Sequence, residues 1–268
     1  MTHIRPIRGD RWTIRYRLKR HCLKPVTTAL RLVPDPPEPR AETPMTRRTN
    51  ATIAGIAYLL YIAAGFPSMV LNNRATSGEG MAAKLANMAL HAGDVRLAAV
   101  LSLIGCFCAL VLAVTLYGIT REQDRDLAML GLTCRVAEGV VGAASIPTTL
   151  GLLAVTMAVG TNAVDPAAAA AVGAFVLNQT WLIGATFFAV GSMLFSWLLL
   201  RGRMVPDWLA ALGVIGSAVL VIGLPLQIMD LLPGLVTQLM WIPVAVFEIV
   251  VAVWLIVKGV RSEGVAPA

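Results

Sequence analysis

Six long apolar runs follow one another along this chain after residue 50, with short polar stretches between them. The shortest run has 21 residues, and a helix of about 20 residues crosses a hydrocarbon core roughly 30 Å thick. Residues 53–64 and 209–224 are apolar on every face, as in helices surrounded by lipid or by other helices. The predicted membrane spans are residues 51–71, 97–119, 127–159, 172–200, 208–229 and 235–257.

This pattern predicts an all-α fold, a polytopic membrane helix bundle with six transmembrane helices. The third span is long and contains Pro147, so we expect a kink or a break there. In the loop at residues 72–94, Met81, Leu85 and Met88 share a helical face, which predicts a short interfacial helix. Asp94 suits an N-cap for the second span.

Composition agrees with a membrane protein, since 57% of the residues are hydrophobic and 14% are charged, against about 45–50% and about 25% in soluble domains. The net charge of +7 is concentrated at the N-terminus. Residues 1–49 hold 12 Lys/Arg and 4 Asp/Glu, a balance of +8, and the rest of the chain sums to −1. The charge therefore does not indicate a nucleic-acid partner. The expected partner is the lipid bilayer, and a membrane-protein partner or a homo-oligomer stays open.

Residues 1–44 form a basic extension with a proline cluster at Pro34, Pro36, Pro37 and Pro39, and no fold is expected there. Met45 then precedes a short basic stretch and the first span, as at the start of a compact bacterial membrane protein. We expect that the start site is assigned upstream of the true one. The predicted organisation is an extension at residues 1–44 and a transmembrane domain at residues 45–268.

Short loops carry the orientation signal, because Lys and Arg are retained on the cytoplasmic side. One side of the predicted bundle has eight basic residues close to the spans, and the other side has three. We therefore expect a multi-pass protein of the bacterial cytoplasmic membrane with both termini in the cytoplasm. The eight are Arg47, Arg48, Arg121, Arg125, Arg201, Arg203, Lys258 and Arg261.

Three ionisable residues fall inside the spans, where a charge costs about 2.5–3.5 kcal/mol even on a mild insertion scale. At about 1.5 Å per helical residue, Arg135, Glu138 and Glu248 all lie at a similar depth. One interpretation is a charge-paired lock, with Arg135 between the two carboxylates and the third and sixth spans held in register. The other is a functional cluster, in which a carboxylate titrates or the cluster binds an ionic ligand.

Motifs for enzyme chemistry are absent. The chain has no Gly-x-Ser-x-Gly turn, no His-Glu-x-x-His pair and no phosphate-binding glycine loop. Its cysteines, Cys22, Cys106, Cys108 and Cys134, have no histidine at metal-site spacing. No catalytic, cofactor-binding or metal-binding residue is predicted, and enzyme activity is not expected.

From Met45 onward the chain resembles a bacterial six-span membrane family known as domain of unknown function 4386. The order and spacing of short motifs carry the resemblance: Arg48, Ala54-Gly55, Tyr58-Leu59, Arg96-Leu97, Leu116-Tyr117, Arg135 with Glu138, Phe195-Ser196, Arg201, Pro206, Trp208-Leu209, Leu212-Gly213, Phe247-Glu248, Trp254-Leu255 and Lys258-Gly259. The resemblance implies a six-helix membrane fold and no particular activity.

Two hypotheses of function follow. The first is a structural, regulatory or accessory membrane protein in which the polar cluster only holds the bundle together. The alternative is a small transporter or ligand-binding membrane protein that uses the intramembrane cluster of Arg135, Glu138 and Glu248.

Overall fold

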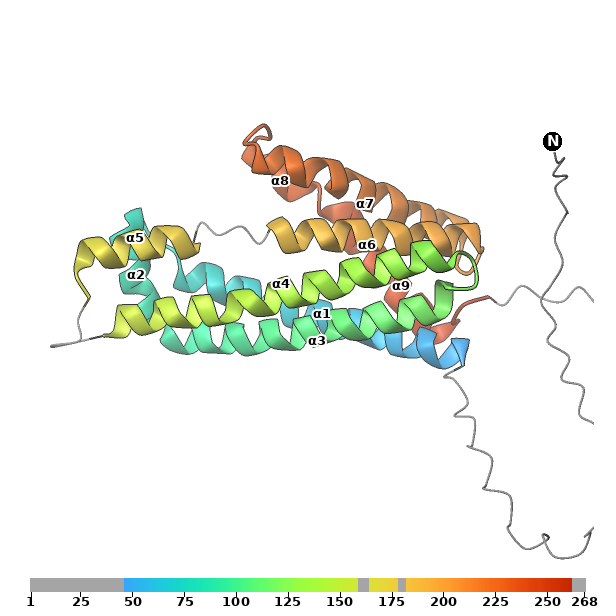
Figure 1. Ribbon diagram of the computed structural model, residues 1–268, viewed down its shortest axis with the longest axis horizontal. Coiled ribbons are helices and arrows are strands. Elements are labelled where there is room, and N and C mark those ends of the chain that lie inside the picture. The colour runs from blue at the N-terminus through green and yellow to red at the C-terminus, as the bar shows by residue number, and fades with distance from the viewer. Residues whose placement is uncertain (1–45, 159–163, 178–181, 262–268) are drawn as a thin grey trace, which may run out of the picture. The chain divides into compact units, whose positions relative to one another are not determined.

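The computed structural model describes residues 46–158, 164–177 and 182–261, all of which belong to a unit at residues 44–268. The predicted extension at residues 1–44 lies outside the described residues. The described residues form nine helices and no strand (Figure 1). The helices are α1 (Arg47–Ala75), α2 (Gly80–Leu90), α3 (Ala92–Thr120), α4 (Arg125–Met157), α5 (Pro166–Leu177), α6 (Leu182–Arg201), α7 (Asp207–Ile228), α8 (Gly234–Leu239) and α9 (Ile242–Val257).

Six segments of this unit are long and apolar enough to cross a membrane, which confirms the predicted six-span helix bundle. Helices α1, α3, α4 and α7 contain most or all of the first, second, third and fifth predicted spans. The remaining two spans differ in detail. The fourth is covered by α5 and α6, which flank residues 178–181, outside the described part of the chain.

The sixth predicted span is interrupted, because α8 ends at Leu239 and α9 starts at Ile242. Pro243 occupies the first turn of α9. A proline has no N–H to donate to the carbonyl four residues earlier, and its ring clashes with that carbonyl, so one helix cannot run smoothly through this point. The interruption leaves α9 with 16 residues.

The third span is not broken at Pro147, since α4 continues through this residue as one helix of 33 residues. The interfacial helix predicted in the first loop is present as α2. The prediction that Asp94 caps the second span is wrong. Helix α3 begins earlier, after His91, so Asp94 lies in its first turn, where its carboxylate is 3.8 Å from the Arg74 guanidinium.

Six of the helices form a closed ring. Along α1, α3, α4, α6, α7 and α9, each helix packs on the next, and α9 packs on α1. Helices α2 and α5 pack on α4 and on each other, and with the nearby ends of α1, α3 and α4 they enclose a second, smaller apolar cluster around Met88 and Leu152. Figure 1 shows α2 and α5 at the end of the bundle away from the start of α1.

Small residues allow the ring to close. A methyl group on Gly55 of α1 would lie 2.6 Å from the carbonyl oxygen of Ala252 in α9. A methyl group on Gly216 of α7 would lie 3.0 Å from the backbone nitrogen of Val244. Close backbone approach of this kind stabilises helix pairs in lipid, where the hydrophobic effect does not drive helices together.

The first residues of α1 tie the ring together at what we name the basic end, the end that carries the eight basic residues given above. The Arg48 guanidinium donates hydrogen bonds to the carbonyl oxygens of Ile256 and Val257, at 3.1 and 3.3 Å. Arg47 donates to the carbonyl of Ile119 at 3.0 Å. The last carbonyls of a helix lack partners within the helix, so these arginines cap the C-terminal ends of α9 and α3.

Replacing Gly55 by alanine should destabilise the protein by about 1–3 kcal/mol, because the added methyl group overpacks the contact between α1 and α9. The midpoint of thermal unfolding in detergent measures this. Gly65→Ala in the same helix is the matched control, since no atom lies within 4 Å of its Cβ position. Equal midpoints for the two variants would contradict the close approach.

Candidate functional site

Arg135 lies inside the ring, in the first half of α4, and its side chain is 0% exposed. Three helices contribute its contacts: α4 itself, α1 and α6. A methyl group on Gly191 of α6 would lie 3.1 Å from the Arg135 Cδ, so the lack of a side chain at this position makes room for the stem of the arginine.

The charge of Arg135 is compensated first by Glu138, three residues further along the same face of α4. Nη1 of Arg135 lies 2.9 Å from Oε2 of Glu138. None of the three guanidinium nitrogens makes a directed hydrogen bond within the described part of the chain, so the contact is ionic. Tyr61 of α1 donates a hydrogen bond of 2.7 Å to the other carboxylate oxygen of Glu138.

Two aromatic rings complete the surroundings of the guanidinium. The Cζ of Arg135 lies 4.9 Å from the ring centroid of Phe188 in α6 and 5.7 Å from that of Tyr61. The negative face of an aromatic ring attracts a cation, by about 2 kcal/mol where water is excluded. Phe188 also packs on Trp241, with centroids 6.0 Å apart. The arginine is thus linked to α1 and α6 as well as to its own helix.

Glu248 of α9 is buried, with 5% of its surface exposed. It is within electrostatic range of Arg135 and Glu138, the other two ionisable residues that the sequence places at this depth. However, the carboxylate of Glu248 is too far from Arg135 to form an ion pair. Its Oε1 also has no hydrogen-bond partner among the described residues. The expectation that Arg135 is ion-paired on both sides is met for Glu138 alone.

Three buried serines near this level also lack partners. Ser192 and Ser196 of α6 and Ser217 of α7 have hydroxyl groups without a hydrogen bond in the described chain. A hydroxyl inside a helix commonly bonds to the carbonyl four residues earlier, as Thr115 and Thr120 do at 2.7 and 2.8 Å. The three serine hydroxyls make no such bond.

The serines lie where α6 packs on α7. Ser196 Oγ lies 2.5 Å from the Cβ position of Gly213 in α7. Ser192 is one turn from Ser196, and Ser217 is one turn from Gly213. Because α6 and α7 run antiparallel, Ser192 and Ser217 are both displaced by one turn toward the same end of the bundle. The serines therefore form a polar strip between α6 and α7.

The sequence did not single out Tyr61 and Phe188 as partners of the cluster. One signal was present for Tyr61: Tyr58 and Tyr61 lie three residues apart inside a span, away from the interface where tyrosine is usual. Phe188 carries no such signal, because a phenylalanine in a membrane helix most often faces lipid or core.

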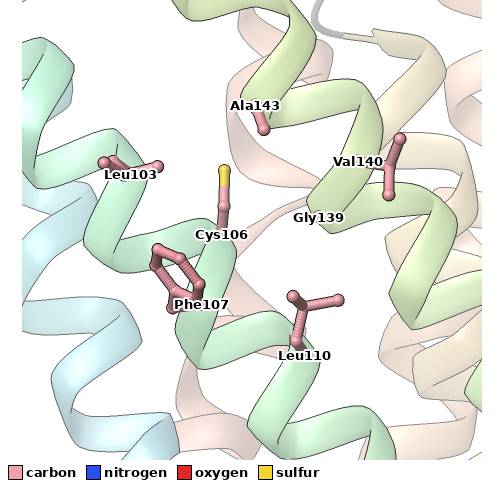
Figure 2. Close-up of a pocket in the computed structure, with 7 residues that line it drawn as sticks. All are labelled: Leu103, Cys106, Phe107, Leu110, Gly139, Val140 and Ala143. Atoms are coloured by element: carbon pink, nitrogen blue, oxygen red, sulfur yellow. The ribbon is translucent and has the colours of Figure 1, made fainter.

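A shallow apolar groove of about 110 Å³ lies between α3 and α4. Figure 2 shows Cys106 pointing into the space between the two helices, beside Phe107 and facing Gly139 and Ala143. The groove is lined by Leu103, Cys106, Phe107, Leu110, Gly139, Val140 and Ala143. This lining has no ionisable carboxyl or basic group, so the groove does not suit an ionic ligand.

Metal binding finds no support in the described residues, which hold no group of three His, Cys, Asp or Glu side chains that could hold an ion. A buried cation, two carboxyl groups and free hydroxyls can bind or exchange protons or bind a small polar ligand. The site lacks a histidine and an activated nucleophile.

A comparison with family models matches residues 53–259 to the family described as Domain of unknown function (DUF4386). The chain belongs to the DUF4386 family. The matched residues of this DUF4386 chain include Arg135, Glu138 and Glu248 and run from α1 to the end of α9. No curated protein and no solved structure matches the chain.

Tyr61→Phe should lower the free energy of unfolding by about 1.5–3 kcal/mol, the usual worth of a hydrogen bond to a charged group, because Glu138 loses its only hydrogen-bond donor among the described residues. Thermal unfolding in detergent measures the loss. Tyr117→Phe is the control, since Tyr117 is partly buried and its hydroxyl makes no hydrogen bond in the described chain. A loss of the same size in both variants would rule out a special role for Tyr61.

Proposed function

We propose that this integral membrane protein is a small transporter or ligand-binding protein that takes up and releases a proton at Glu248. The burial of Glu248 without an ion pair carries this proposal. An ionised carboxylate inside a membrane bundle costs several kcal/mol unless it is paired. Binding a proton from water converts Glu248 to the neutral acid and removes this cost.

The surroundings of Glu248 contain groups that act on its charge in opposite directions. The ionisable groups in electrostatic contact with it are Tyr58 and Tyr61 of α1 and Arg135 and Glu138 of α4. Arg135 stabilises the deprotonated carboxylate, whereas burial and Glu138 favour the protonated acid. Helix α7, which also packs on α9, has a single ionisable residue, Asp207, exposed in its first turn.

The polar strip of Ser192, Ser196 and Ser217 supports a route for the proton. Each of these hydroxyls is free to accept and donate a hydrogen bond, and buried polar groups without partners in a native structure need an explanation. We infer that these hydroxyls take part in the path by which Glu248 exchanges its proton.

A second candidate function is structural or regulatory. It is favoured by the contacts of Arg135, which join α1, α4 and α6 through Glu138, Tyr61 and Phe188. Under this alternative the cluster only holds the ring together, and Glu248 stays protonated at all working pH values.

We also propose which end of the bundle faces the cytoplasm. Arg48 bonds to the carbonyls at the end of α9, so the start of α1 and the end of α9 lie at the same end of the bundle. That end carries eight basic residues, and the positive-inside rule assigns it to the cytoplasm of a bacterial cell membrane.

Infrared difference spectra of the purified full-length protein, recorded between acid and alkaline pH, should contain a carboxylic acid C=O band that changes with pH. Glu248→Gln preserves the size of the side chain and removes its titration, so this band should be lost. Glu79→Gln, at an exposed carboxylate, should leave it unchanged. A band that persists in Glu248→Gln would disprove proton exchange at this residue.

Proton flux into proteoliposomes separates the two candidate functions. With an imposed pH gradient, the wild-type protein should carry protons, and Glu248→Gln should lose the flux while keeping its thermal midpoint. If Arg135→Met and Glu248→Gln both lower the midpoint and the wild type carries no flux, the structural role stands and the proposal fails.

A further inference from the structure

We propose that Arg121, Arg125 and Arg203 bind the phosphate of an anionic phospholipid headgroup at the basic end. We name these three residues the arginine patch. Each is exposed, and none makes a side-chain hydrogen bond or ion pair within the described part of the chain. The site is independent of the interior cluster.

Two loops bring the patch together. Arg121 begins the loop between α3 and α4, Arg125 begins α4, and Arg203 lies in the loop between α6 and α7. The loops are in contact, because Arg201 Nη1 lies 3.4 Å from Asp124 Oδ2 and a methyl group on Gly202 would lie 2.9 Å from Gln123 Cδ.

Two of the nearby acidic residues already have partners. Asp124 pairs with Arg201 and also accepts a hydrogen bond from the backbone N–H of Leu127. Glu122 pairs with Arg47 at 3.4 Å. Asp126 and Asp207 are exposed carboxylates beside the patch that have no side-chain partner in the described residues. The patch therefore keeps a positive balance that suits an anion.

Arg203 occupies a position that favours glycine. Its φ is +46°, and the bonds from Arg203 N to Leu200 O and from Met204 N to Leu199 O, both 3.0 Å, form the motif that ends α6. Glycine adopts this left-handed conformation without cost, and most other residues do not. Helix α9, by comparison, is followed by Gly259 in such a conformation. An exposed arginine that is unfavourable for the fold indicates a role outside it.

Apolar side chains lie close enough to hold the acyl chains. In the first turns of α4, Met129 and Leu130 are 43% and 50% exposed, and Trp208 in the first turn of α7 is 62% exposed. Tryptophan is enriched at the level of the headgroups, so the loops lie where lipid phosphates are found. A free phosphate ion would use the arginines alone, and the exposed apolar residues favour a lipid.

Native mass spectrometry of the full-length protein, mixed in detergent with equal amounts of phosphatidylglycerol and phosphatidylcholine, tests the site. The wild type should retain phosphatidylglycerol preferentially. Arg203→Gly should reduce this retention about five-fold and raise the thermal midpoint. Arg203→Lys should keep retention within about two-fold of the wild type, given a similar charge. Unchanged retention in Arg203→Gly, or equal retention of both lipids, would overturn the site.

A control variant and a competition experiment identify where the lipid binds and which part of it is recognised. Lys258→Gln, at the same end but directly after α9, should leave retention unchanged. A loss as large as that of Arg203→Gly would show that retention depends on the general surface charge and not on the arginine patch. Inorganic phosphate in excess over lipid should not displace phosphatidylglycerol. Displacement by phosphate would show that the patch binds the free anion and would refute the lipid assignment.

Discussion

The fold depends on how the ring of helices accommodates one buried guanidinium. A cation in the membrane interior is tolerated only if neighbouring groups replace the water it has lost. Arg135 obtains these groups from Glu138 on its own helix, Tyr61 on α1 and Phe188 on α6. This requirement fixes the rotation of α4 about its own axis, so that Arg135 faces the interior. It also fixes the distance between α4 and α6, which Gly191 keeps short.

The rest of the bundle is held by contacts that work in lipid. Gly55 brings α1 against the backbone of α9, and Ser68 donates a hydrogen bond of 2.9 Å to the carbonyl of Ala98 across α1 and α3. Arg47 and Arg48 satisfy carbonyls at two helix ends. Small residues, interhelical hydrogen bonds and capped ends therefore supply the specificity that apolar burial supplies in a soluble core.

Length and hydropathy predicted the six spans, because bilayer thickness sets the length of a spanning helix. The cost of intramembrane charge also identified Arg135, Glu138 and Glu248. Helical periodicity does not reveal which residue of another helix lies opposite, so Phe188 and the missing ion pair of Glu248 could not be predicted. Proline alone was an ambiguous signal: α4 continues through Pro147, whereas the sixth span is interrupted beside Pro243.

The closure of the ring by α9 has a consequence for biogenesis. Among the helices of the described residues, α9 leaves the ribosome last, yet it packs on α1, which leaves first. Before α9 inserts, the ring is open between α1 and α7, and Glu248 is absent from its interior. Arg135 and Glu138 of α4 are therefore enclosed on all sides only once α9 is in place. Closing the ring therefore requires a contact between helices that lie far apart in the sequence.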